Sequence, residues 1–420
     1  MSDDRAIDLV VAKLKRLPQD RLQAAVVLEA FVGRKAPDSF TVGADQVDAV
    51  GGLDRPAPPA PDGASGPRLA DVAVLLTIVI SAMVWMPALR SSLGSDTDQV
   101  IAWSLPIALA AEGAIRIRYL SCGNVRALRP VLPAVNGSAA LLLMAAVPAG
   151  ELVASAAALI VLWGQATILG VRGWWMRYVA LVAITAVALW LLPWDAAVLV
   201  GAALVLLAVN VVATSSEEGV RSLPEPVDTT LQAAVIGAAC GFMLVVDPGV
   251  WRGATVETTA AVLLVTTTGW VASARLSRIW QDLPSRLAAV EIGAGWAGDA
   301  AGRAVGGAAL GASARVVVPA GASLLLHAVI EADRGLVVVA AFCLFTLAML
   351  SVSLTVAARH WAATAIICVA GAAVSFAVPS SVPALPLLCG SAVVLLCSAA
   401  LATATFRDAG AAFPTRMMVR

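Results

Sequence analysis

Charged side chains are rare in the long apolar segments of this chain, and two groups of them stand at helical spacing. Glu112 and Arg116 are four residues apart, with Arg118 just beyond, so a helix would place the first two on one face, where they can pair. A charge at the centre of a bilayer costs about 2.5–3.5 kcal/mol on insertion scales and usually faces a cavity or a partner. We predict that these residues line the cytoplasmic mouth of a pathway for an anionic substrate. An ordinary interfacial ion pair is the alternative.

The second group is His327 and Glu331, which are again four residues apart. Histidine changes its charge near neutral pH and can pass protons between neighbours. We therefore treat this pair as the candidate group for coupling transport to protons. The alternative is an interfacial histidine whose hydrogen bonds are simply satisfied.

Signatures of known catalytic chemistry are missing. The sequence has no GxxxxGK[ST] phosphate-binding loop and no HExxH pair. Its two histidines do not belong to any set with metal-ligand spacing. We therefore expect no metal, no cofactor and no enzyme activity, although carboxylates from distant segments could still converge into a catalytic site.

Composition defines the environment of the chain. Hydrophobic residues make up 60% of the 420 residues, charged residues make up 13%, and the mean hydropathy is +0.88. A soluble domain is only about 45–50% apolar, so the lipid bilayer is the expected surrounding and a water-soluble protein is excluded. The 28 basic and 28 acidic residues balance, which argues against nucleic acid as a partner.

Apolar runs long enough to cross a membrane fill most of the chain. A crossing helix needs about 20 apolar residues, and this criterion predicts an all-α polytopic protein with about twelve transmembrane helices. The predicted spans are 70–90, 98–117, 131–149, 152–171, 177–193, 195–214, 230–248, 256–276, 312–331, 335–357, 361–379 and 383–406. They form two six-helix halves, residues 69–214 and 230–406, which a polar cytoplasmic linker at 215–229 joins.

Arginine placement predicts the orientation. Arginine follows every even-numbered span, in groups after spans two, four, eight and twelve and singly after six (Arg221) and ten (Arg359). The intervening loops carry at most one, namely Arg90, Arg252 or Arg334. Positive residues in short loops stay on the cytoplasmic side, so both termini are predicted to be cytoplasmic in a multi-pass inner or plasma membrane protein.

The ends of the chain differ from its apolar middle. Residues 1–52 contain two amphipathic helical patterns and form a short amino-terminal helical region, and a Pro, Ala and Gly-rich linker follows at 53–68. Residues 407–420 form a cytoplasmic tail. The helical region could bind a partner, lie on the membrane or simply cap the bundle.

Two further groups of residues have simple interpretations. The six cysteines lie in or beside apolar runs without C-x-x-C spacing, so we expect small buried residues rather than disulfides or metal ligands. Asp247 and Glu257 flank Arg252 between two predicted spans, and a solvated outer loop is the expected position for all three.

Several segments resemble a known family. The stretch "ARLSRIWQDLPSRLAAV" after the eighth span, Pro319 in the ninth, and the early segments "SAMVWMPALRSSL" and "IRIRYLSCGNVRALRPVLPAV" are similar to polysaccharide and lipid-linked oligosaccharide flippases. Those flippases belong to the multidrug/oligosaccharidyl-lipid/polysaccharide exporter superfamily. The resemblance covers the last 340 residues or so by layout and excludes the amino-terminal helical region. An Arg-x-x-Gly signature after the first span is absent.

The resemblance implies a transporter that flips or exports a polysaccharide or lipid-linked sugar by alternating access, and glycosyltransferases would be natural partners. The competing hypothesis is a non-transporting scaffold subunit of a secretion or envelope-assembly complex. An open cleft between two halves would favour transport, whereas a flat bundle with a large apolar side would favour assembly.

Overall fold

The computed structural model describes much of the chain after residue 92. The described residues are 93–115, 132–171, 175–193, 227–247, 333–357, 360–379 and 381–407, with shorter pieces within 196–207, 250–272 and 306–325. Every regular element in these ranges is a helix, in agreement with the predicted all-α class. The amino-terminal region 1–52, the linker 53–68, the first predicted span 70–90 and the tail after residue 407 lie outside the described part.

The helices begin and end close to the predicted apolar segments. Their bounds are η1 Gly94–Asp96, α5 Thr97–Ile115, α7 Leu132–Ala146, η3 Val147–Ala149, α8 Glu151–Val171, α9 Trp175–Leu191, α11 Val227–Val245, α14 Asp333–Ala357, α15 Trp361–Ala377 and α16 Leu385–Arg407. Local hydropathy therefore locates the helices well. The total number of crossings stays a prediction.

Length and hydropathy single out three of the described helices as able to cross a bilayer. They are Val227–Val245, Gly335–Val356 and Leu385–Thr405, within α11, α14 and α16. Shorter apolar helices are Asn136–Ala149, Glu151–Leu162, Ala309–Ala322 and Trp361–Ala377. Helix α5 is not among them, and it carries Asp98, Gln99 and Glu112. The described part of the chain thus has the character of a polytopic membrane protein.

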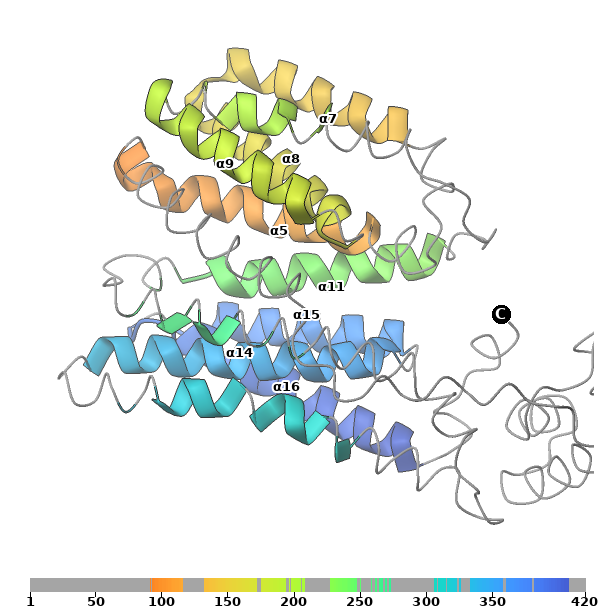
Figure 1. The fold of residues 1–420 in the computed structure, drawn as a ribbon. Coiled ribbons are helices and arrows are strands. Elements are labelled where there is room, and N and C mark those ends of the chain that lie inside the picture. Colours follow the sequence, from red (N-terminus) through yellow and green to blue (C-terminus); the bar gives the residue numbers. More distant parts are fainter. Residues whose placement is uncertain are drawn as a thin grey trace, which may run out of the picture.

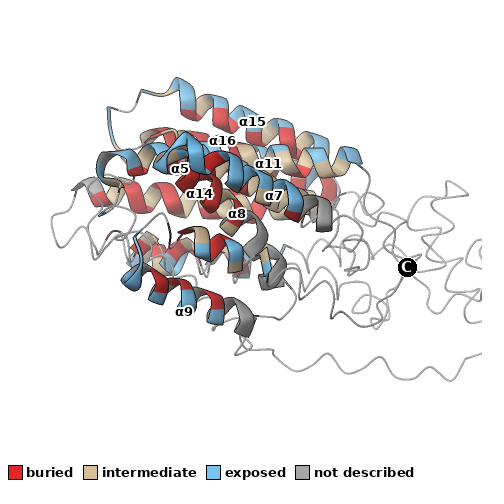
Figure 2. Cartoon of the chain, turned by 90° about the horizontal axis from the view of Figure 1, so that it is seen from above, coloured by how far each residue is buried: buried red, intermediate tan, exposed pale blue. Residues whose placement is uncertain are grey.

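Side-chain burial follows a pattern typical of a membrane bundle (Figure 2). Large apolar residues point outward, with Trp190 87% exposed, Phe376 74% and Leu396 71%. The buried positions are mostly alanine, valine, serine and threonine. Such small residues let helix backbones approach closely, whereas lipid tails readily cover large apolar side chains. The outward apolar surface therefore fits contact with lipid.

The two largest buried cores of the described residues involve helices that are labelled in Figure 1. One core contains residues of α5 and α8 with Val198 and Ala202, and it also includes Val245 at the end of α11. The other contains residues of α11, α14, α15 and α16. Helix α11 lies between α5 and α15 in Figure 1 and packs against both. The α5–α11 pair is therefore the junction between a first helix group (α5, α7, α8, α9) and a second helix group (α11, α14, α15, α16).

The cysteines only partly follow the prediction of small buried residues. Cys240 and Cys368 are buried, which confirms it for these two. Cys343 and Cys389 are half-buried, and Cys397 is exposed on α16, so the prediction is wrong for Cys397. The apolar pattern along α16 does not distinguish its outward face from its packed face. All five described cysteines are free thiols, and Cys122 lies outside the described residues.

Candidate functional site at the junction of the two helix groups

Glycines bring α5 and α11 into direct backbone contact. Gly237 and Gly241 are four residues apart on α11, so they share one face of that helix. A Cβ atom added to Gly237 would clash with the carbonyl oxygen of Leu109, and one on Gly241 would lie 2.6 Å from Cα of Pro106. On α5, a Cβ on Gly113 would lie 2.6 Å from the carbonyl oxygen of Ala233. The junction has no room for larger side chains at these positions.

These contacts also give the relative direction of the two helices. Gly113, near the end of α5, meets Ala233 near the start of α11, whereas Pro106 meets Gly241 further along. The pair is therefore antiparallel. Glu112, half-buried beside Gly113, consequently lies toward the amino-terminal end of α11. The loop that follows α11 lies at the opposite end of the junction.

That loop holds a buried carboxylate, Asp247, which is not among the predicted site residues. Asp247 is 3% exposed, so its predicted position in a solvated loop is wrong. Its Oδ2 atom accepts a 2.7 Å hydrogen bond from the backbone N–H of Ala384, and its backbone carbonyl accepts one from the N–H of Val250 at 3.2 Å. A buried carboxylate must be compensated by such donors, which explains why it can leave water here.

Asp247 acts as an amino-terminal cap of α16, although it is far from that helix in the sequence. Ala384 precedes the first residue of α16, and its carbonyl accepts the N–H of Leu388 at 2.9 Å. Ala384 also has φ +66°, a left-handed conformation that is uncommon for a residue other than glycine. A negative charge at a helix amino terminus is stabilised by the helix dipole. The carboxylate therefore ties the end of α11 to the start of α16.

A second polar cluster lies where the carboxy-terminal ends of α14 and α16 meet the amino-terminal end of α15. Nε2 of His360 lies 2.9 Å from the Thr405 hydroxyl, and the hydroxyl of Thr364 donates to that of Thr355 at 2.9 Å. The Thr364 hydroxyl also lies 2.7 Å from the carbonyl oxygen of His360. His360 lies between two predicted spans and is not among the predicted site residues. This cluster holds the loop between α14 and α15 against the end of α16.

Replacing Thr405 with valine tests the cluster. The change keeps the side-chain shape but removes the hydroxyl that meets His360, so we expect a loss of about 0.5–1.5 kcal/mol in stability. Thr403→Val is the matched control, because Thr403 is exposed on the same helix and bonds only to the carbonyl of Ala399. Thermal unfolding of the purified protein in detergent measures both. Equal melting temperatures for the two variants would contradict the contact.

The residues predicted to carry transport are only partly described. Glu112 is placed, on α5 at the junction of the two helix groups. Arg116 and Arg118 lie outside the described residues, as do His327 and Glu331. Their pairing and their roles in substrate binding and coupling therefore remain predictions. Among the described residues, no group of three or more His, Cys, Asp or Glu side chains is arranged to hold a metal ion.

Together these features define, for the described part of the chain, a helical protein of membrane type with two packed helix groups. The groups meet at a glycine-lined junction with a polar residue at each end. No family model matches the sequence, and no curated protein matches it.

Solved structures offer two matches, both to MATE transporters. One is an outward-facing multidrug resistance MATE family transporter of the MOP superfamily, with 11% identity, a TM-score of 0.40, and coverage of 82% of this chain and 96% of that one. The other is a MATE protein in complex with MaL6, with 12% identity, a TM-score of 0.32, and coverage of 81% and 95%. Both matches are long, but at these scores they do not establish a shared fold.

Proposed function

We propose that this chain is a membrane transporter that flips or exports a polysaccharide or lipid-linked sugar by alternating access. One observation carries the proposal: apart from Val245 of α11, the two largest cores draw on different helix groups, and those groups meet at the α5–α11 junction. Alternating access by rocking bundles needs two bodies that hold their own shape and can change their angle about a shared contact. A single bundle packed around one core would lack that property.

The junction is suited to act as the pivot of such a motion. At Gly237 and Gly241 the backbones of α5 and α11 are in close contact, without a side chain between them at these two positions. The two groups can then change their angle without repacking bulky residues, while the glycine contact keeps α5 and α11 together. Glu112 and the carboxylate of Asp247 lie toward opposite ends of this pivot, so each is near a different mouth of the proposed pathway.

The substrate class rests on charge. A lipid-linked sugar carries an anionic phosphate or diphosphate, which needs positive partners to leave water. Arg116 and Arg118 would supply that charge at the cytoplasmic mouth, and Glu112 would hold Arg116 in place one helical turn away. His327 and Glu331 would couple the cycle to a proton gradient. Glycosyltransferases would supply the substrate on the cytoplasmic face.

Flipping of a fluorescent lipid-linked oligosaccharide in proteoliposomes tests the proposal. The full chain should expose the label to an external quencher faster than empty vesicles do. We expect Glu112→Gln and Arg116→Ala to slow flipping by about tenfold or more, because both remove charge interactions from an apolar region. Both variants should elute normally in size-exclusion chromatography.

Glu151→Gln is the matched control, because Glu151 is exposed at the first turn of α8. It should flip the substrate at the normal rate. If the chain exported a cationic dye but flipped no lipid-linked sugar, the proposed substrate class would be wrong and the proposed transporter function would stand. Absence of flux for either substrate would instead favour the scaffold hypothesis.

A further inference from the structure

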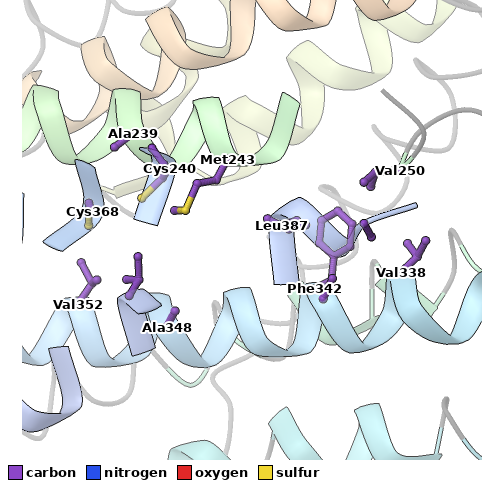
Figure 3. Packing of buried hydrophobic residues seen from close by; sticks show 14 residues of the cluster. Ala239, Cys240, Met243, Val250, Val338, Phe342, Ala348, Val352, Cys368 and Leu387 are labelled. Atoms are coloured by element: carbon purple, nitrogen blue, oxygen red, sulfur yellow. The ribbon is translucent and has the colours of Figure 1, made fainter. Parts of the chain in front are cut away.

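Three sulfur atoms from three helices meet in the core of the second helix group. The Cys240 thiol of α11 donates to the Met349 thioether of α14, with the sulfur atoms 3.4 Å apart. Cys368 of α15 belongs to the same buried core as Cys240. Figure 3 shows the two cysteines close together between these helices. All three residues lie within their helices rather than in the connecting loops.

The surroundings of the sulfur cluster are apolar. Cys240 is 6% exposed and Cys368 is fully buried, and the other members of this core are alanine, valine, leucine, methionine and phenylalanine. A net charge would be costly in such surroundings. Any metal ion bound there must therefore form a neutral complex with its ligands. The charge of the metal ion must then equal the number of thiols that lose a proton.

The donor set points to a soft cation. Thiolate and thioether sulfur select soft cations such as Cu(I), whereas a structural Zn²⁺ site needs four ligands of which sulfur, imidazole or carboxylate are typical. No third Cys, His, Asp or Glu joins the two thiols among the described residues, so a zinc site has no support there. Two thiols and one thioether can instead surround a cation of low coordination number.

We propose that Cys240, Cys368 and Met349 form a binding site for a soft monovalent cation, Cu(I) or its chemical analogue Ag(I). One thiol S–H bond breaks, a sulfur–metal bond forms, and one proton passes to solvent. The second thiol and the thioether each donate a lone pair without losing charge. The bound complex is then neutral, with one positive metal and one thiolate, and no electron is transferred.

The site would connect three helices of the second helix group. Cys240 lies directly beside Gly241, which contacts α5 at the junction. A cation bound to α11, α14 and α15 would hold the junction helix to its own group more firmly. Binding of the cation would therefore make the second helix group more resistant to thermal unfolding. This effect does not depend on which substrate the protein carries.

Silver binding to the full chain in detergent tests the site. The experiment uses a background variant in which Cys122, Cys343, Cys389 and Cys397 are serine, so that only the paired thiols remain. After addition of Ag(I) in chloride-free buffer and removal of excess with a weak thioether competitor, metal analysis should find about one silver per chain. A pH indicator should register about one proton released for each silver bound. The melting temperature should rise.

Variants separate metal binding from packing. Cys368→Ser should abolish silver retention, and Met349→Leu, which keeps the volume, should weaken binding by about tenfold or more. Met144→Leu is the control, because Met144 is exposed on α7, and it should bind silver normally. Melting and size-exclusion profiles without silver verify that each variant is folded. Absence of bound silver in the folded background variant, equal retention in folded Cys368→Ser, or release of two protons per silver would each overturn the proposal.

Discussion

Gly241→Ala is expected to destabilise the protein and to slow its transport cycle. The new methyl group would lie 2.6 Å from Cα of Pro106, and backbone atoms cannot rotate away as a side chain can. Forcing atoms into a packed contact costs roughly 1–3 kcal/mol. Gly237→Ala meets the carbonyl of Leu109 in the same way, so the double variant should lose more than either single variant. Thermal unfolding and the flipping assay measure these effects.

Gly137→Ala is the matched control for this experiment. Gly137 lies within α7, and no atom lies within 4 Å of the Cβ that alanine would add. Alanine in a helix is favoured over glycine by about 0.5–1 kcal/mol, so this variant should be as stable as the parent or slightly more stable. A melting temperature for Gly241→Ala that matches Gly137→Ala would contradict the close approach of α5 and α11.

Asp247→Ala should have the second large effect. It removes the acceptor for the buried N–H of Ala384, and an unsatisfied buried donor costs about 1–3 kcal/mol. It also removes the negative charge next to the start of α16. Asp247→Asn keeps an acceptor oxygen without the charge, so it should lose less stability than alanine. The melting temperatures should therefore fall in the order parent, asparagine, alanine.

Asp228→Ala serves as its control. Asp228 is exposed in the first turn of α11, so its loss should cost only about 0.3–1 kcal/mol through the helix dipole. Asparagine and alanine at position 247 that destabilise equally would mean that charge, rather than the hydrogen bond, is the important part of the interaction. Equal stability of Asp247→Ala and Asp228→Ala would exclude the capping contact.

Apolar periodicity predicted the helices well but the candidate site only in part. Glu112 was identified because a carboxylate in an apolar segment is visible in the sequence. Asp247 was assigned to a solvated loop because it follows an apolar segment and has Arg252 nearby. Its partner, the backbone N–H of Ala384, is 137 residues away, and any residue other than proline would supply the same N–H. No pattern of side-chain types signals such a contact.

Hydropathy and the spacing of charges by themselves determined that this chain is helical, suited to a bilayer and poor in catalytic motifs, because those properties follow from each segment alone. Only the tertiary structure decided that Gly237 and Gly241 face α5, that Asp247 caps α16, and that Cys240 meets Met349 in the core that also holds Cys368. The physical reason is that lipid tails and protein interiors are similarly apolar. A helix in a membrane therefore shows little contrast between its packed face and its exposed face, and its neighbours are chosen by close packing.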